Sequence, residues 1–163
     1  MSETVPAEAG SPSSEAAPPA PAQPFRLLPQ LDDRNRPFWT GGEHGELRLW
    51  RCQACGHWIH PPSVRCPLCL SKELAVEATS GRAVVHTYTV NHQPWFPGLE
   101  PPYVVAIVDL PEQPGLRLTT GLVGVPVDKV RIGLDVEVCF ERYDDVWLPF
   151  FRPVAAAAGS EAG

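Results

Sequence analysis

Two pairs of cysteines in one short stretch constrain this chain more than any other feature. Two residues separate Cys52 from Cys55 and Cys66 from Cys69, and ten residues lie between the pairs. Each pair holds two thiolates one turn apart, and Gly56 after the first pair lets backbone N–H groups turn toward sulfur. Four soft ligands in a closed tetrahedron suit Zn²⁺ and leave no position open for chemistry. The spacing predicts a zinc ribbon with a structural Zn²⁺, in preference to four free thiols or two disulfides.

Composition indicates that both ends of the 163-residue chain lie outside the folded part. Residues 1–24 contain six Pro, six Ala and no basic residue, so they bury too little apolar surface to offset the entropy of ordering. We expect this tail and the tail at 155–163 to be disordered. The first tail also lacks the features of a secretory signal or a transit peptide, which predicts a cytoplasmic protein.

The remaining composition excludes two classes of protein. No apolar run approaches the roughly 20 residues of a membrane helix, so no membrane span is expected. The formal net charge is −6 at pH 7, and four thiolates on one Zn²⁺ make it more negative. Without a basic stripe, binding to nucleic acid is disfavoured. Four of the five cysteines lie in the metal motif and Cys139 stands alone, which fits a reducing cytoplasm.

A helical lead is expected over residues 25–45. Asn35 or Asp33 can cap a short helix, Pro37 suits its first turn, and the glycines at 41 and 42 are expected to end it. Phe38 and Trp39 form an apolar anchor on this helix, which is too short to be stable alone. They pack either on the core of this chain, which we favour, or on a partner subunit.

The zinc ribbon is expected over residues 46–78. Residues 46–51 alternate polar and apolar side chains and lead into the first knuckle, residues 57–60 form a return strand before two prolines, and residues 74–78 close the ribbon. His57 and His60 are interpreted as strand-surface residues because four cysteines already complete the ligand set.

Five strands are expected in the second unit, over residues 79–154. β-branched and aromatic residues fill 81–90, 103–109, 116–123, 135–141 and 146–151, with a turn-like segment at 126–130 between the third and fourth strands. This order matches an OB-fold, a partly open Greek-key barrel. The predicted fold is mainly β: a short N-terminal helix, a zinc ribbon and a five-stranded OB-fold barrel.

A zinc ribbon directly before an OB barrel resembles the acyl-CoA-associated "domain of unknown function" proteins, which have a rubredoxin-like zinc ribbon and an OB-fold. The resemblance covers roughly residues 36–153. Its matching stretches are Phe38-Trp39, 47–55, 66–69, 81–90, 102–108, Arg117-Leu118, 131–138 and 148–150. All four ribbon cysteines are present, although some relatives lose theirs. Residues 111–115 depart from the pattern, because they are longer than the usual tight turn before Arg117.

The resemblance implies an accessory subunit without catalytic residues of its own. Such subunits form hetero-oligomers with thiolase-like enzymes, including the aldolases and thiolases of steroid side-chain breakdown, or with enoyl-CoA hydratases. They are expected to help hold or channel acyl-CoA while the partner performs the chemistry.

The loop at 91–102 is the first candidate contact. Four prolines stiffen it, and Trp95 and Phe96 cannot easily fold under so short a connection. They are candidates to meet the partner enzyme or to line the route of the pantetheine arm, as are Phe38 and Trp39. The alternative is that Trp95 and Phe96 only cover the end of the barrel.

Basic residues of the barrel are candidates for the phosphates of coenzyme A, although isolated basic residues on strands are usually solvated. They are Arg82, Arg117, Lys129 and Arg131.

An enzyme would need a nucleophile and a base that activates it, and the candidates for these roles are Cys139, His86, His92 and Asp109. No activating partner can be named for any of them, so we predict no catalytic residue. A nucleic-acid-binding OB protein and an acyl-CoA thioester hydrolase are the alternative functions.

Overall fold

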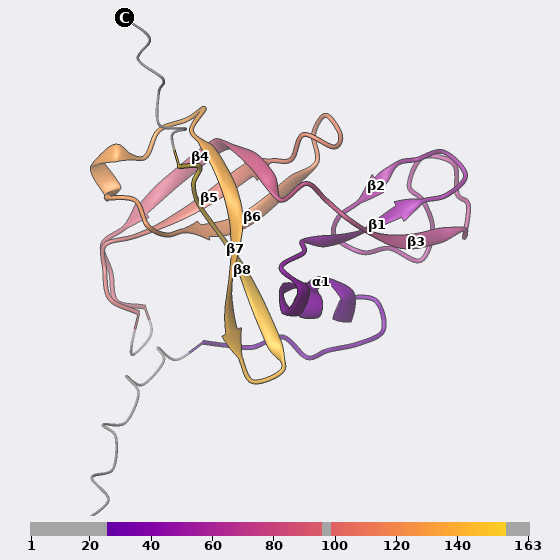
Figure 1. Ribbon diagram of the computed structural model, residues 1–163, viewed down its shortest axis with the longest axis horizontal. Helices are drawn as coiled ribbons and strands as arrows, with labels where there is room; N and C mark the ends of the chain where they lie inside the picture. The colour runs from indigo at the N-terminus through magenta and orange to yellow at the C-terminus, as the bar shows by residue number, and fades with distance from the viewer. Residues whose placement is uncertain (1–25, 96–98, 156–163) are drawn as a thin grey trace, which may run out of the picture.

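The structure is a computed structural model that describes residues 26–95 and 99–155. Two β-sheets make up most of it. A three-stranded sheet has the order β2-β1-β3, and five strands close into a barrel in the order β4-β5-β6-β8-β7 (Figure 1). The predicted mainly β fold is confirmed. In chain order the elements are α1 (Arg36–Thr40), the 3₁₀ turn η1 (Gly41–His44), β1 (Arg48–Cys52), β2 (Trp58–Ile59), β3 (Leu74–Ala78), β4 (Arg82–Asn91), β5 (Tyr103–Asp109), β6 (Arg117–Leu122), the 3₁₀ turn η2 (Val127–Lys129), β7 (Asp135–Tyr143) and β8 (Val146–Pro153).

The ribbon sheet is built around β1, which pairs antiparallel with both β2 and β3. The alternation in the sequence explains its orientation, since Leu47 and Leu49 are buried while Arg48 and Trp50 are only half-buried. β2 is shorter than the predicted 57–60, because the prolines that follow lack the N–H groups to extend the ladder.

The barrel contains the five predicted strands. β5 shows the expected alternation, with Val104, Ala106 and Val108 buried and their neighbours half-buried. β7 and β8 form a long hairpin, and Asp144 in its turn adopts a positive φ of 54°. β6 and β8 are parallel and share one register pair, Leu122 with Phe151, so this seam is the weakest closure of the barrel.

The helical lead differs from the prediction in the capping at its N-terminal end. Asn35 precedes α1, but its side chain does not cap the helix, and neither does Asp33; the carboxylate of Asp32 instead accepts hydrogen bonds from the backbone N–H groups of Arg34 and Asn35. Gly41 directly follows the last residue of α1, as predicted, and the chain then continues through the separate 3₁₀ turn η1 to Gly45. Gly42 is required for space, since a Cβ there would collide with Trp147 and Phe140.

None of the described helices, which span at most five residues, has the length and apolar character that crossing a membrane requires.

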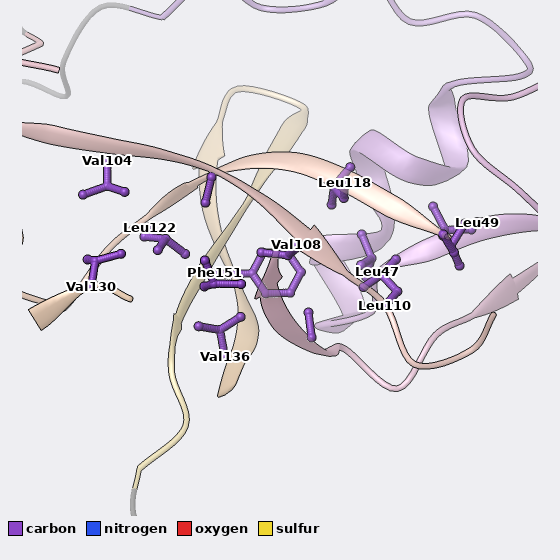
Figure 2. Close-up of a cluster of buried hydrophobic side chains, with 14 of the residues drawn as sticks. Leu47, Leu49, Val104, Val108, Leu110, Leu118, Leu122, Val130, Val136 and Phe151 are labelled. Carbon is purple, nitrogen blue, oxygen red and sulfur yellow. The ribbon is translucent and has the colours of Figure 1, made fainter. Parts of the chain in front are cut away.

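One hydrophobic core runs through both sheets. Leu47, Leu49 and Trp58 of the ribbon belong to the same cluster of buried side chains as Leu110 and Leu118 of the barrel. Figure 2 shows the ribbon leucines beside the barrel leucines, at one end of a core that continues through Val108 and Phe151. Phe38 of α1 packs against this cluster, so the favoured reading of Phe38 as an intramolecular anchor agrees with the structure.

A loop between β5 and β6 fastens the ribbon to the barrel. This loop contains the residues at 111–115 that depart from the family pattern, and Gln113 is its contact residue. Gln113 Oε1 accepts a hydrogen bond from the backbone N–H of Trp58 at 2.8 Å, and Gln113 Nε2 donates to the carbonyl of Trp58 at 3.3 Å. The loop therefore positions an amide that satisfies the backbone groups of Trp58 in β2.

We expect Gln113→Ala to lower the free energy of unfolding by about 1–3 kcal/mol, because it leaves a half-buried N–H without its acceptor. Urea denaturation of the metal-loaded protein measures the change. Gln93→Ala is the matched control, since this exposed glutamine lies on the β4–β5 loop away from the ribbon, and it is expected to change stability by less than about 0.5 kcal/mol. Equal effects of the two substitutions would contradict the role of Gln113.

Candidate metal centre and cavities

The four ribbon cysteines converge on one point. Their Sγ atoms all lie within 4.8 Å of one another, and Cys52 to Cys69 and Cys55 to Cys66 are each separated by 3.6 Å. A disulfide would require about 2.05 Å, so all four thiols are unpaired. A tetrahedron with metal–sulfur bonds of about 2.3 Å has edges of about 3.8 Å, which fits these separations.

The two knuckles repeat the same backbone geometry. The N–H of Gly56 donates to the carbonyl of Cys52 at 2.9 Å, and the N–H of Leu70 donates to the carbonyl of Cys66 at 3.0 Å. The fourth residue after each first cysteine has a positive φ, 76° at Gly56 and 61° at Leu70. Leucine is strained in this conformation, whereas glycine is not. The first knuckle thus uses the glycine that the sequence predicts, and the second tolerates an exposed leucine.

The electrostatics of the site favour a bound cation once the thiols are deprotonated. Hydrogen bonds led by the backbone N–H of Cys69 outweigh burial and lower the pKa of the Cys66 thiol to about 7. The backbone N–H of His57 acts in the same direction on Cys55, but the surrounding thiols Cys69, Cys66 and Cys52 together with burial raise its pKa to about 12. Four thiolates this close repel one another, so a bound metal ion is needed to deprotonate all of them. Cys139 lies on β7, outside this cluster.

Two of the four predicted phosphate-binding residues lie together. Arg82 and Arg131 line a cavity of about 730 Å³ beside the start of β4 and β7, which we call the mouth cavity. Its walls are otherwise mostly apolar, with two carboxylates. The lining residues are Arg82, Ala83, Val84, Asp109, Leu110, Pro111, Arg131, Leu134, Asp135, Val136, Val154 and Ala155.

The other two predicted phosphate-binding residues lie elsewhere. Lys129 is exposed and its nearest acid is Asp128 at 3.6 Å. Arg117 donates from Nε to Asp109 Oδ1 at 2.8 Å, and Nδ1 of His86 lies 2.8 Å from the other oxygen of the same carboxylate. The Arg117 guanidinium, with a smaller contribution from His86, lowers the pKa of Asp109.

This group of three residues was missed in the sequence, where His86 and Asp109 were considered separately. The residues come from β4, β5 and β6, and only the cross-strand register brings them together. No serine, threonine or cysteine side chain among the described residues makes a hydrogen bond to His86, so the group contains no activated nucleophile. Burial raises the pKa of the Cys139 thiol, which disfavours the reactive thiolate.

A second cavity of about 560 Å³ lies where β6 and β8 separate, and we call it the seam cavity. Two of the predicted contact residues, Phe38 and Trp39, line it, together with Arg117. Its full lining is Phe38, Trp39, His60, Pro61, Arg117, Leu118, Thr119, Gly121, Leu148, Pro149 and Phe150.

The remaining predicted contact is on the β4–β5 loop. Trp95 is 66% exposed, and its Nε1 donates to Asn91 Oδ1 at 3.0 Å. Asn91 in turn donates from Nδ2 to the hydroxyl of Tyr103 at 2.7 Å, so a polar chain fixes the indole. Phe96 lies outside the described residues.

A four-cysteine ribbon fused through a common core to a closed five-stranded barrel defines a metal-ribbon OB-fold protein. Two family models match the chain in the same order: "ChsH2, rubredoxin-like zinc ribbon domain" over residues 39–75 and "ChsH2, C-terminal OB-fold domain" over residues 76–141. The chain belongs to the ChsH2 family, whose relatives are also described as DUF35 proteins.

Relatives with established descriptions carry two kinds of name. The chain is 33% identical over 146 residues to the 3-oxo-4,17-pregnadiene-20-carboxyl-CoA hydratase alpha subunit of Mycobacterium tuberculosis, covering 89% of this chain and 45% of that protein. It is 40% identical over 123 residues to a probable enoyl-CoA hydratase alpha subunit of Thermomonospora curvata, covering 74% and 38%. The chain thus spans less than half the length of these two relatives. It is 37% identical to a DUF35 domain-containing scaffold protein of Methanothermobacter thermautotrophicus, covering 56% of this chain and 69% of that one.

A solved structure extends the comparison. A chain of the structure described as "Ltp2-ChsH2(DUF35) aldolase" superposes with a TM-score of 0.70 at 37% identity, covering 77% of this chain and 98% of that chain. A DUF35 protein from Sulfolobus solfataricus, with a TM-score of 0.51 at 18% identity over 72% of this chain and 82% of that one, shares the fold.

Removal of the metal with a chelator is expected to disorder the knuckles while the barrel stays folded. The far end of the ribbon has only a small core of its own, Cys52, Ile59 and Cys66, and depends on metal binding of about 10–16 kcal/mol as in small zinc domains. Hydrogen exchange should show faster exchange of backbone amides between residues 52 and 74, and unchanged protection in β5 and β6. Cys66→Ser should reproduce the effect and Cys139→Ser should not. Complete unfolding of the apo protein would contradict this division.

Proposed function

We propose that the chain is a non-catalytic accessory subunit that binds a thiolase-like enzyme or an enoyl-CoA hydratase subunit and supports acyl-CoA binding there. The main support is the similarity to a chain of an aldolase structure, because the superposition covers 98% of that chain. The similarity to proteins described as scaffolds agrees with it. Thiolases and aldolases, including those of steroid side-chain degradation, are the proposed partners, in a hetero-oligomer. A hydratase partner is supported by the relatives named as alpha subunits.

The metal is proposed to be a structural Zn²⁺ on Cys52, Cys55, Cys66 and Cys69. Four sulfur ligands in a closed set favour Zn²⁺ and leave no site for a water or a substrate. When bound, the ion supplies only folding free energy. Four cysteines that serve as metal ligands rather than disulfides also support the proposed cytoplasmic location.

Trp95 is the proposed centre of the partner interface. A large exposed aromatic side chain that is already held in one orientation loses little conformational entropy on binding, and such residues commonly dominate interfaces. Phe96 is proposed to act with it.

The phosphates of coenzyme A are proposed to bind at the mouth cavity, next to Arg82 and Arg131. These two guanidinium groups face one cavity large enough for a nucleotide-sized ligand. Asp109 also lines this cavity, and its ion pair with Arg117 offsets part of its charge. Asp135 is the remaining acidic group at this rim. Lys129 is outside the lining and is not retained in the proposal.

The partner is tested by capture from native extract, identification, and measurement of its Kd with recombinant protein. Trp95→Ala is expected to weaken binding of a thiolase-like or hydratase subunit by roughly tenfold or more, as for a central interface aromatic. Ile132→Ala is the matched control, since Ile132 is 67% exposed against 66% for Trp95 but lies before β7. Equal loss in the two variants, or none in Trp95→Ala, would remove Trp95 from the interface.

Coenzyme A contact is tested by calorimetric titration of acetyl-CoA into the chain and its partner complex. The double substitution Arg82→Ala/Arg131→Ala is expected to reduce affinity by roughly tenfold or more, because each charge-assisted hydrogen bond contributes about 1.5–3 kcal/mol. Lys129→Ala should leave affinity unchanged. If all variants bind acetyl-CoA as the original protein does, the mouth cavity is not the site.

A further inference from the structure

The seam between β6 and β8 opens away from its single register pair. At Leu122 and Phe151 the strands are hydrogen-bonded, and one residue earlier on β8 the ring of Phe150 covers Gly121, where a Cβ would be too close. The hydroxyl of Thr120 then reaches the carbonyl of Pro149 at 3.0 Å. Beyond this point no pairing between the two strands exists in the described residues. The seam cavity occupies this opening.

Three parts of the chain border the seam cavity. α1 lies between the β7–β8 hairpin and the ribbon (Figure 1) and contributes Phe38 and Trp39. The ribbon contributes His60, whose ring centroid lies 5.3 Å from that of Phe38. Leu118, a buried residue of the barrel core, also lines the cavity, so the opening extends between the strands toward the interior. The cavity is therefore a slot with aromatic and aliphatic walls.

Among the described residues, Arg117 is the one arginine or lysine that lines this slot, and none of the lining residues is acidic. Its Nε donates to Asp109, which fixes the orientation of the guanidinium and leaves its terminal amino groups available. Arg117 is half exposed at the edge of the cavity. Burial lowers the pKa of His60, so this histidine stays neutral near pH 7 and adds no second charge. The slot thus combines an apolar interior with one oriented cation.

A second arginine lies against the same aromatic wall. The guanidinium carbon of Arg26 is 5.5 Å from the ring centroid of Phe150. Its Nε is buried and has no hydrogen-bond partner within residues 26–95 and 99–155. A buried donor without a partner is costly. Arg26 does not line the seam cavity, however, so the proposed site uses Arg117 alone.

We propose that the seam cavity binds an amphipathic carboxylate, a small molecule with an apolar chain or ring system and one carboxylate group. The apolar body lies between Trp39 and Phe150, and the carboxylate accepts hydrogen bonds from the terminal amino groups of Arg117. The volume of about 560 Å³ is in the range of small-molecule sites. This inference goes beyond the proposed function, because it requires neither coenzyme A nor a partner subunit.

The test is an NMR titration of the metal-loaded chain with decanoate and, as the uncharged probe, 1-decanol. Decanoate should shift the Trp39 indole and the backbone amides of Thr119 and Phe150, and should bind roughly tenfold or more tightly than decanol. Arg117→Gln should reduce decanoate affinity by about the same factor and leave decanol unaffected. Arg152→Gln is the matched control, because Arg152 is also exposed and ion-paired, to Glu137 at 3.1 Å, but lies outside the slot.

A variant in which a large side chain fills the slot distinguishes ligand binding in the cavity from ligand binding elsewhere on the surface. Thr119→Trp introduces a large side chain at an exposed position that lines the cavity, and it should abolish the shifts with both probes while circular dichroism and metal content stay unchanged. The proposal is overturned if decanoate and decanol bind equally, if Arg117→Gln and Arg152→Gln behave alike, or if the filled variant still binds. NMR shifts confined to Leu68 and Leu70, the exposed leucines of the second knuckle, would also overturn the proposal.

Discussion

The packing of the ribbon against the barrel is the interaction on which the other features depend. Leu47 and Leu49 are almost fully buried in a cluster that also holds Leu110 and Leu118. Burial of these two ribbon leucines stabilises the joined structure by about 3–6 kcal/mol. The near half of the ribbon is therefore held by the hydrophobic effect, whereas the knuckles depend on the metal. Two independent forces act on one small sheet, and each fixes a different end of it.

This arrangement also creates the seam cavity. His60 and Pro61 follow directly after β2, so they reach the barrel seam only because the shared core holds β2 there. α1 has no buried residue of its own, and it is positioned by contacts of Phe38 with the same core. A ribbon that swung freely would leave the seam as an exposed strand edge, which is a hazard for aggregation. Docking of the ribbon and α1 covers part of that edge and leaves an open slot beside it.

The sequence predicted what is local and periodic. The cysteine spacing, the alternation around Leu47 and the β-rich segments were sufficient for the ribbon and the five strands. Contacts that depend on the register of strands far apart in the sequence were not predictable. An example is the pair of contacts that the Asp109 carboxylate makes with His86 and Arg117. The packing role of Gly42 was not predictable for a similar reason, because the rule that glycine ends a helix uses only local sequence. Gly42 makes room for the β7–β8 hairpin, which lies about 100 residues later in the chain.

For ligand binding at the two cavities, the charges that line each cavity matter more than the net charge of −6. Arg117 and Asp109 form one ion pair, yet they border different cavities, Asp109 the mouth and Arg117 the seam. The pair is largely exposed and contributes little to stability, about 0–1 kcal/mol. Its larger effect is on orientation: the carboxylate turns the remaining donors of Arg117 toward the seam and supplies a negative charge at the mouth. Because both cavities depend on this carboxylate, substitution of Asp109 alters the two binding surfaces together, whereas substitution of Arg82 or Arg131 acts on the mouth alone.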